Sequence, residues 1–247
     1  MTITYITAAE SSTTDHVGGA ASVIAALRPR AYYDPGYAGG AESYRRSLAA
    51  AGEHRAQWKR VRPGDSLVVD EVTVVFLAPD STWAEGLRDP NDASTVALVR
   101  VGSDPIPLTG DAEAAEERWL LAHRGKLLDV DILKVAHHGS STSSTDDFLD
   151  AVTPRIALVS VGAGNVYRHP SRGVLRALAA HGAVTLRTDL HGTIVLRTDG
   201  VSLEVDAAGG IAGQDPQHRH GHPAPDEGLV GAQLRDLDLL VLARGRR

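Results

Sequence analysis

The chain has 247 residues, 43% of them hydrophobic, and a formal net charge of −6 at pH 7. It can bury the core of one large domain, and its net charge excludes a surface that is basic all round, as many nonspecific nucleic-acid binders have. With no cysteine, histidines and carboxylates are the candidate metal ligands. No apolar run reaches the roughly 20 residues of a membrane span, and residues 1–10 lack a signal-peptide pattern. We therefore expect a soluble, cytoplasmic chain.

The first quarter of the chain predicts alternating strands and helices. Residues 3–7 alternate apolar and polar side chains as a strand does, and a helix pattern through Leu27 is ended by Pro29. Asp15 and His16 stand between these elements, where Asp15 is either a helix N-cap or a ligand. Further expected elements are a strand over 31–34, a helix over 40–51 and a solvated basic edge over 55–62.

The middle of the chain predicts mainly sheet. Runs rich in β-branched residues, separated by short polar turns, indicate strands over 66–69, 72–77, 94–101 and 106–109. Pro105 and Pro107 each remove a ladder donor around the last of these, so we expect an edge or distorted pairing there. This run stops at Gly110, and Asp111 then opens a helix pattern. A second carboxylate therefore stands at a strand-to-helix turn.

The stretch LKVAHHGSSTSS, residues 133–144, is where we expect the functional site. The apolar run 132–136 is typical of a buried strand, and Gly139 lets the backbone turn steeply, so His137 and His138 leave the sheet at its end. Neutral imidazoles there are good metal ligands, and the hydroxyls that follow cluster where free backbone N–H groups favour an anion. The stretch predicts a metal and phosphate site. The alternative is a pair of structural histidines that cap a helix.

The last part of the chain completes a mixed α/β domain. We expect helices over 148–152 and 171–181 and strands over 156–161, 184–187, 193–197 and 201–205. The loop GAGNVYRHP, residues 162–170, carries a dense polar set, and functional residues concentrate in such loops. We place the domain over 1–206, a flexible linker rich in His, Pro and Gly over 207–228, and a tail over 229–247 that docks as an added strand or helix.

Three motifs follow predicted strands: Asp15-His16, the LTGD that ends at Asp111, and LKVAHHGS. In this order they resemble the motifs of the metallo-β-lactamase superfamily. Within it, DILKVAHHGSSTSS and the NVYRHP loop are similar to the metallo-β-lactamase-like domain of ComEC-type DNA-internalisation competence proteins. The resemblance implies an α/β fold, the αβ/βα four-layer sandwich, with the metal site along the edge between two sheets. Because the chain begins at the strand before the first motif, we expect it to be missing some N-terminal strands.

The resemblance also implies roles for the matching residues. The implied metal ligands, for one tightly bound Zn²⁺ or Mn²⁺, are Asp15, His16, Asp111 and His138. The implied catalytic residues are Asp15, His137 and His169, and the implied substrate-binding residues are Ser140, Asn165, Tyr167 and Arg168. The implied function is metal-dependent hydrolysis of phosphoesters, of a nuclease-like phosphodiesterase kind, with single- or double-stranded DNA as the substrate.

The first histidine motif of the family, H-x-H-x-D-H, is only half present. Ser11 and Thr13 stand where its two leading histidines would be, and hydroxyls are poor zinc ligands by comparison. We therefore expect a one-metal or incomplete two-metal site. Two alternatives stay open: a catalytically disabled binding module, and a metal-independent hydrolase with His137 or His169 as base and Ser140 as nucleophile. The oligomeric state is left open as well.

Overall fold

The computed structural model describes residues 5–8, 14–37, 41–69, 71–85, 89–102, 104–198, 203–210 and 240–242. Several sequence-based expectations lie outside these residues. They are the side chains of Ser11 and Thr13, the ends of the strands expected over 3–7 and 201–205, and most of the expected linker and tail. Within the part of the chain that is described, no helix is both long and apolar enough to span a bilayer.

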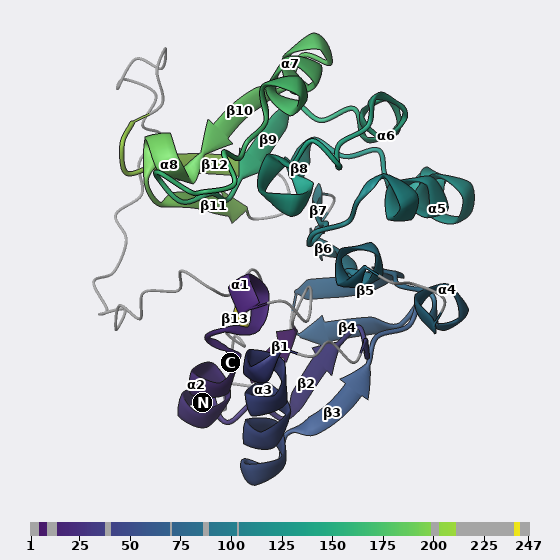
Figure 1. The fold of residues 1–247 in the computed structure, drawn as a ribbon, viewed down its shortest axis with the longest axis vertical. Helices are drawn as coiled ribbons and strands as arrows, with labels where there is room; N and C mark the ends of the chain where they lie inside the picture. The colour runs from purple at the N-terminus through teal and green to yellow at the C-terminus, as the bar shows by residue number, and fades with distance from the viewer. Residues whose placement is uncertain are drawn as a thin grey trace.

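The first sheet has the strand order β13-β1-β2-β3. Its strands are β1 (Tyr5–Ala8), β2 (Ala31–Asp34), β3 (Gln57–Arg60) and β13 (Leu240–Leu242). β1, β2 and β3 run parallel, whereas β13 pairs antiparallel with β1. The helices that follow β1 and β2 are α1 (Thr14–Val17), α2 (Ala20–Leu27) and α3 (Glu42–Glu53). Parallel strands need such crossover connections, and these helices pack beside the sheet in the lower half of Figure 1.

A second, antiparallel sheet has the order β4-β5-β6-β7. Its strands are β4 (Ser66–Val69), β5 (Val72–Ala78), β6 (Val96–Val101) and β7 (Asp104–Leu108). The helix α4 (Ser81–Glu85) follows β5. The edge pairing predicted for the proline-flanked run is confirmed, because β7 ends this sheet and pairs only with β6 among the described strands.

A third sheet consists of three parallel strands, β8 (Ile132–Lys134), β9 (Ile156–Val159) and β10 (Val184–Arg187). Its strand β8 contacts β7 of the second sheet. The helices around it are α5 (Ala114–Arg124), α6 (Asp146–Val152), α7 (Arg172–Ala180) and α8 (Thr188–His191). β11 (Ile194–Thr198) and β12 (Leu203–Ala207) form a separate antiparallel pair. These elements lie in the upper half of Figure 1.

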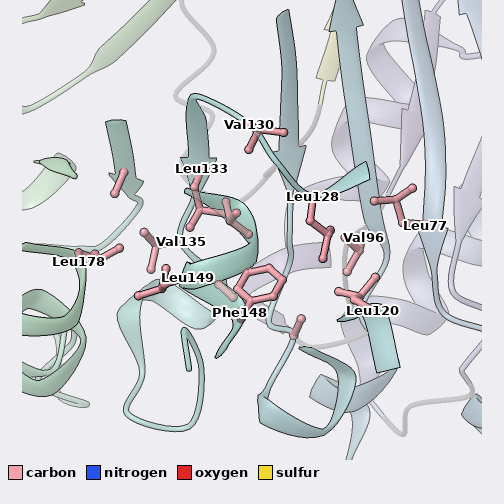
Figure 2. Packing of buried hydrophobic residues seen from close by; sticks show 14 of the residues in the cluster. Leu77, Val96, Leu120, Leu128, Val130, Leu133, Val135, Phe148, Leu149 and Leu178 are labelled. Carbon is pink, nitrogen blue, oxygen red and sulfur yellow. The ribbon is translucent and has the colours of Figure 1, made fainter. Parts of the chain in front are cut away.

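The helices and sheets form four layers, because successive strand residues are buried on opposite faces of each sheet. Tyr32 packs with Ile24 and Tyr44 on the side of α2 and α3, whereas Tyr33, the next residue, stacks on Phe76 of β5 with ring centroids 5.5 Å apart. The opposite face of β5 and β6 packs with β8 and β9 against α5, α6 and α7 (Figure 2). Because successive strand side chains point to opposite faces, the order is helices, sheet, sheet, helices. The expected α/β sandwich is therefore confirmed.

The structure corrects several element boundaries. β3 lies inside the basic stretch expected as a solvated edge, and its four side chains are exposed or half-buried. α5 begins at Ala114, so Asp111 lies in the turn before the helix rather than at its start. β12 ends at Ala207, two residues beyond the end of the strand expected over 201–205. The short helices α1, α4 and α8 were not predicted, because one or two turns carry little periodic signal.

A buried carboxylate on α5 makes stability depend on pH. Glu116 is fully buried, and its Oε2 accepts a hydrogen bond from the backbone N–H of Ser94 at 3.2 Å. Burial raises the pKa of the Glu116 carboxyl well above its ordinary value, and that hydrogen bond offsets the rise only in part. As the pH rises above about 4.5, the unfolded chain releases this proton while the folded chain keeps it, so folding loses stability until the folded pKa is passed.

We therefore expect Glu116→Gln to gain stability relative to the wild type as the pH is raised. The difference in melting temperature should grow by a few degrees as the pH is raised above about 4.5 and should level off once the raised pKa of Glu116 in the folded chain is passed, because the amide has no proton to lose. Thermal denaturation of both proteins at a series of pH values measures this. A difference that stays constant with pH would show that Glu116 is ionised in the folded chain.

Candidate metal centre

The segment after β8 makes a tight turn that is built around a glycine. Over Ala136–Gly139 the backbone is kinked, because His137 (φ 48°) and His138 (φ 53°) both adopt left-handed, non-helical conformations. Such conformations cost about 1–3 kcal/mol per non-glycine residue and persist where surrounding contacts enforce them. Here the N–H of His137 donates to the carbonyl of Gly110 at 3.0 Å, and the N–H of Ser171 donates to the carbonyl of Gly139 at 2.8 Å.

Four side chains from three parts of the fold meet beside this turn. Asp15 and His16 come from α1, Asp111 from the turn after β7, and His138 from the turn after β8. One possible ligand atom from each lies within 4.8 Å of those of the others. Nε2 of His16 is 2.8 Å from Oδ2 of Asp111, and Nε2 of His138 is 3.6 Å from Oδ2 of Asp15 and 3.7 Å from Oδ1 of Asp111. The structure thus brings together the four residues expected as ligands.

The donor set fits a divalent metal ion. Oδ1 of Asp111 and Nε2 of His138 are buried, and neither has a hydrogen-bond partner among the described residues. Nδ1 of His138 lies 2.7 Å from the carbonyl oxygen of Ser160, which can only accept, so Nδ1 carries the proton. In the neutral imidazole the lone pair of Nε2 then faces the carboxylates, an arrangement common in metal-binding histidines. Two carboxylates and two imidazoles suit zinc and similar ions.

The charges in the cluster are strongly coupled. Burial raises the pKa of Asp111, but the hydrogen bond from His16 and the nearby imidazoles outweigh it, so the pKa lies below its ordinary value. Burial lowers the pKa of His138, but Asp15 and Asp111 outweigh it and raise the pKa above its ordinary value. The carboxylate of Asp111 is thus ionised at neutral pH, and it favours a positive charge beside it, whether a proton or a metal ion.

Asp111 is held in place by its own backbone. Its N–H donates to Oγ of Ser94 at 3.0 Å, and Oγ of Ser94 donates to the carbonyl of Asn91 at 2.9 Å. The hydroxyl of the adjoining Thr109 donates to the carbonyl of Lys134 at 2.7 Å, which ties the end of β7 to β8. The turn that carries the carboxylate is therefore fixed to both neighbouring strands.

His137 faces a carboxylate that the sequence did not single out. Its Nδ1 lies 3.0 Å from Oε1 of Glu113, and this oxygen also accepts a hydrogen bond from the hydroxyl of Thr142 at 2.8 Å. Ser140, expected to bind substrate, is 5% exposed, and its hydroxyl is 2.8 Å from that of Thr142. Ser140 is thus part of the framework of the turn, whereas His137 lies at the edge of the cluster.

The loop over 162–170 lies against the same turn. Asn165 closes this loop: its Nδ2 donates to the carbonyls of Gly162 and His169, and its Oδ1 accepts from the N–H of His169 at 2.9 Å. The ring of His169 is 5.7 Å from that of His137, and burial lowers the pKa of His169. The amide of Asn165 is thus engaged with the backbone, whereas the side chains of Tyr167 and Arg168 are exposed and that of His169 is half-buried.

Glu117 is a further residue that sequence reasoning missed. It is fully buried on α5, and it accepts hydrogen bonds from the N–H of Ser144 at 2.5 Å and from the N–H and hydroxyl of Thr145 at 2.9 and 2.7 Å. It therefore fastens the hydroxyl-rich segment after the histidines to α5. A glutamate on the apolar face of the helix pattern is the one signal that could have indicated it.

The fold and this cluster of candidate ligands at strand ends define a class of protein. The sequence profile of the Metallo-beta-lactamase superfamily matches residues 14–163, which is more than half of the chain. The chain therefore belongs to the metallo-β-lactamase superfamily, as its resemblance predicts.

The curated relatives of the chain include a competence protein. The chain is 37% identical over 158 residues to "Competence protein ComA" of Neisseria gonorrhoeae, a match that covers 64% of this chain and 21% of that protein. It is 34% identical over 150 residues to "ComE operon protein 3" of Bacillus subtilis, which covers 61% and 19%. The predicted similarity to ComEC-type competence proteins is confirmed. The chain spans about a fifth of the length of these relatives.

Among solved structures, the chain is similar to CmlA, a diiron beta-hydroxylase from Streptomyces venezuelae. The TM-score is 0.50 at 14% identity, and the match covers 74% of this chain and 43% of that one. At this identity the likeness supports the fold alone, and it agrees with the layers described above.

Proposed function

We propose that this chain is a metal-dependent hydrolase of phosphodiesters, with DNA as the substrate. The observation that carries the proposal is the gathering of Asp15, His16, Asp111 and His138, whose possible ligand atoms lie within 4.8 Å of one another. The name of one relative refers to competence, and we take this as support for DNA over other phosphodiesters. When bound, Zn²⁺ or Mn²⁺ would polarise a phosphoryl oxygen and lower the pKa of a water, to about 7 in favourable zinc sites.

The side chains around the cluster have separate roles in this proposal. Asp111 and His138 would hold the ion, and their contacts with Ser94 and Ser160, respectively, fix their orientation. Asp15 has a side chain that is 58% exposed, so it can contact both the ion and an incoming water. His137 and His169 lie on the side of the 162–170 loop, where they can donate hydrogen bonds to phosphoryl oxygens. Arg168 adds an exposed positive charge on the same loop.

A catalytically disabled binding module is the second candidate. The observation that favours it is the presence of Ser11 and Thr13, which lack the imidazoles of a complete two-metal site. A metal-independent hydrolase has less support, because the hydroxyl of Ser140 is buried beside Thr142 rather than beside a histidine base.

Metal analysis of the purified chain, combined with hydrolysis of bis(p-nitrophenyl) phosphate, separates these candidates. We expect at most about one tightly bound ion per chain, because one ligand set is intact. A chelator should lower hydrolysis at least about 10²-fold, and added Zn²⁺ or Mn²⁺ should restore it, because charge stabilisation at the phosphoryl group is lost with the ion. Elemental analysis and initial rates on the same samples measure both quantities.

Each other result selects an alternative. A chain that binds an ion but hydrolyses no diester, including DNA, is the binding module. Turnover that persists after complete removal of metal is the metal-independent hydrolase. Two tightly held ions per chain would contradict the expected stoichiometry.

A further inference from the structure

A series of aromatic rings leads outward from the metal centre to the surface. The ring centroid of His137 is 6.4 Å from that of His138 and 5.7 Å from that of His169. The ring of Tyr167 then lies 5.8 Å from that of His169 at an interplanar angle of 14°, so the two rings are stacked. Tyr167 is 77% exposed in spite of this contact. One face of its ring is thus supported by His169, and most of its surface is open to solvent.

The backbone fixes the position of this exposed ring. Asn165 bonds to the loop backbone on both sides of Tyr167, through Gly162 and His169, and the N–H of Arg168 donates to the carbonyl of Asn165 at 3.3 Å. The neighbouring Val166 is 85% exposed. Single exposed apolar residues are ordinary on protein surfaces. An exposed ring that is stacked from below and held by a closed loop is instead preorganised for contact with a planar group.

We infer that Tyr167, backed by His169, forms a stacking subsite for an unpaired nucleobase attached to the scissile phosphodiester. The inference rests on the proposed function, and it adds that the substrate carries an unpaired base next to the phosphate that is cleaved. Base–aromatic stacking contributes about 1–3 kcal/mol per base and tolerates any base, because every base has a flat face. A base inside a duplex already stacks on its neighbours, so the subsite selects strands whose bases are free.

A metal-independent binding measurement tests the subsite directly. Fluorescence anisotropy with the full chain in chelator compares a short labelled single-stranded oligonucleotide with a matched one that carries abasic sites. We expect the wild type to prefer the base-bearing strand, and Tyr167→Ala to reduce this preference at least about fivefold. Tyr167→Phe keeps a flat ring and should retain the preference, whereas Tyr167→Leu, which is apolar but not planar, should not.

Hydrolysis of a dinucleotide and of its abasic analogue, with metal restored, gives a second readout. The ratio of the two kcat/KM values should fall in Tyr167→Ala and Tyr167→Leu, mainly through KM, and persist in Tyr167→Phe. An unchanged preference in Tyr167→Ala, or a retained one in Tyr167→Leu, overturns the subsite. A wild type that hydrolyses neither diester but shows a base preference that Tyr167→Ala removes supports the subsite and overturns only the proposed hydrolysis.

Discussion

Replacing Asp111 with asparagine is expected to remove both metal binding and diester hydrolysis while the chain stays folded. The carboxylate lies 2.8 Å from His16 and 3.7 Å from His138, so it is the central member of the proposed ligand set. An amide of the same shape carries no charge to hold a divalent ion. Loss of residues that merely support a ligand costs about 10–100-fold in affinity or activity, so loss of the ligand should cost at least about 10²-fold.

The matched control for this variant is Asp131→Asn. Asp131 precedes β8, and its side chain is 69% exposed and 3.9 Å from Arg155. It is not a member of the metal-ligand cluster. Metal content, initial rates and circular dichroism of both variants are compared with those of the wild type. If Asp111→Asn kept its metal, the ligand set would be wrong. If it lost the fold as well, the charge of Asp111 would be a requirement for folding rather than for the site.

Replacing Gly139 with alanine is expected to destabilise the chain by roughly 2–5 kcal/mol and to abolish activity. Gly139 has φ +80°, a conformation that L-residues rarely adopt, and a Cβ added there would lie 2.5 Å from Cβ and 3.1 Å from Cα of Pro170. The turn therefore has to move away from the 162–170 loop. Because His137 and His138 precede Gly139 directly, such a movement displaces the imidazole of His138, which is a proposed metal ligand, and that of His137, which is a proposed substrate contact.

Gly162→Ala is the matched control, since Gly162 lies in the 162–170 loop, against which Gly139 packs through Pro170. A Cβ added at Gly162 would have no heavy atom of the described residues within 4 Å, apart from its chain neighbours. Chemical denaturation should therefore show a change of less than about 1 kcal/mol for Gly162→Ala and the large loss for Gly139→Ala. A loss of less than about 1 kcal/mol for Gly139→Ala as well would mean that the turn accommodates the added methyl group without strain against Pro170.

Elements with a strong local signal could be predicted from the sequence. The helix α7 begins as expected, because Ser171 caps it by accepting from the N–H of Val174 at 3.2 Å. The strand β3 could not be predicted, because Gln57–Arg60 lacks apolar alternation. It is a strand because it pairs in parallel with β2, in the register Ala31↔Gln57. Here the tertiary context overrides the local pattern.

The clustered residues of the candidate site could be predicted from the sequence, but the contacts around them could not. Asp15, His16, Asp111 and His138 each follow a strand, and the structure brings them together, while their role as ligands stays a prediction. Glu113 could not be found, because a carboxylate before a helix already has a local explanation in the helix dipole, and its partner His137 is distant in sequence. Nor could the sequence tell that both ends of the Asn165 amide bond to the loop that carries it.

The four clustered residues come from separate parts of the chain: two follow a strand of the first sheet, and two follow strands of the opposite half of the sandwich. In the unfolded chain, bringing residues 15, 111 and 138 together requires the closure of long loops, which is entropically costly. An ion that needs all of them therefore binds the native state and not the denatured ensemble, so it stabilises the fold by RT ln(1 + [L]/Kd), or about 2.7 kcal/mol at a hundredfold excess over Kd. The ion would act as a reversible crosslink between the two halves of the molecule, and the melting temperature of the chain would report its free concentration.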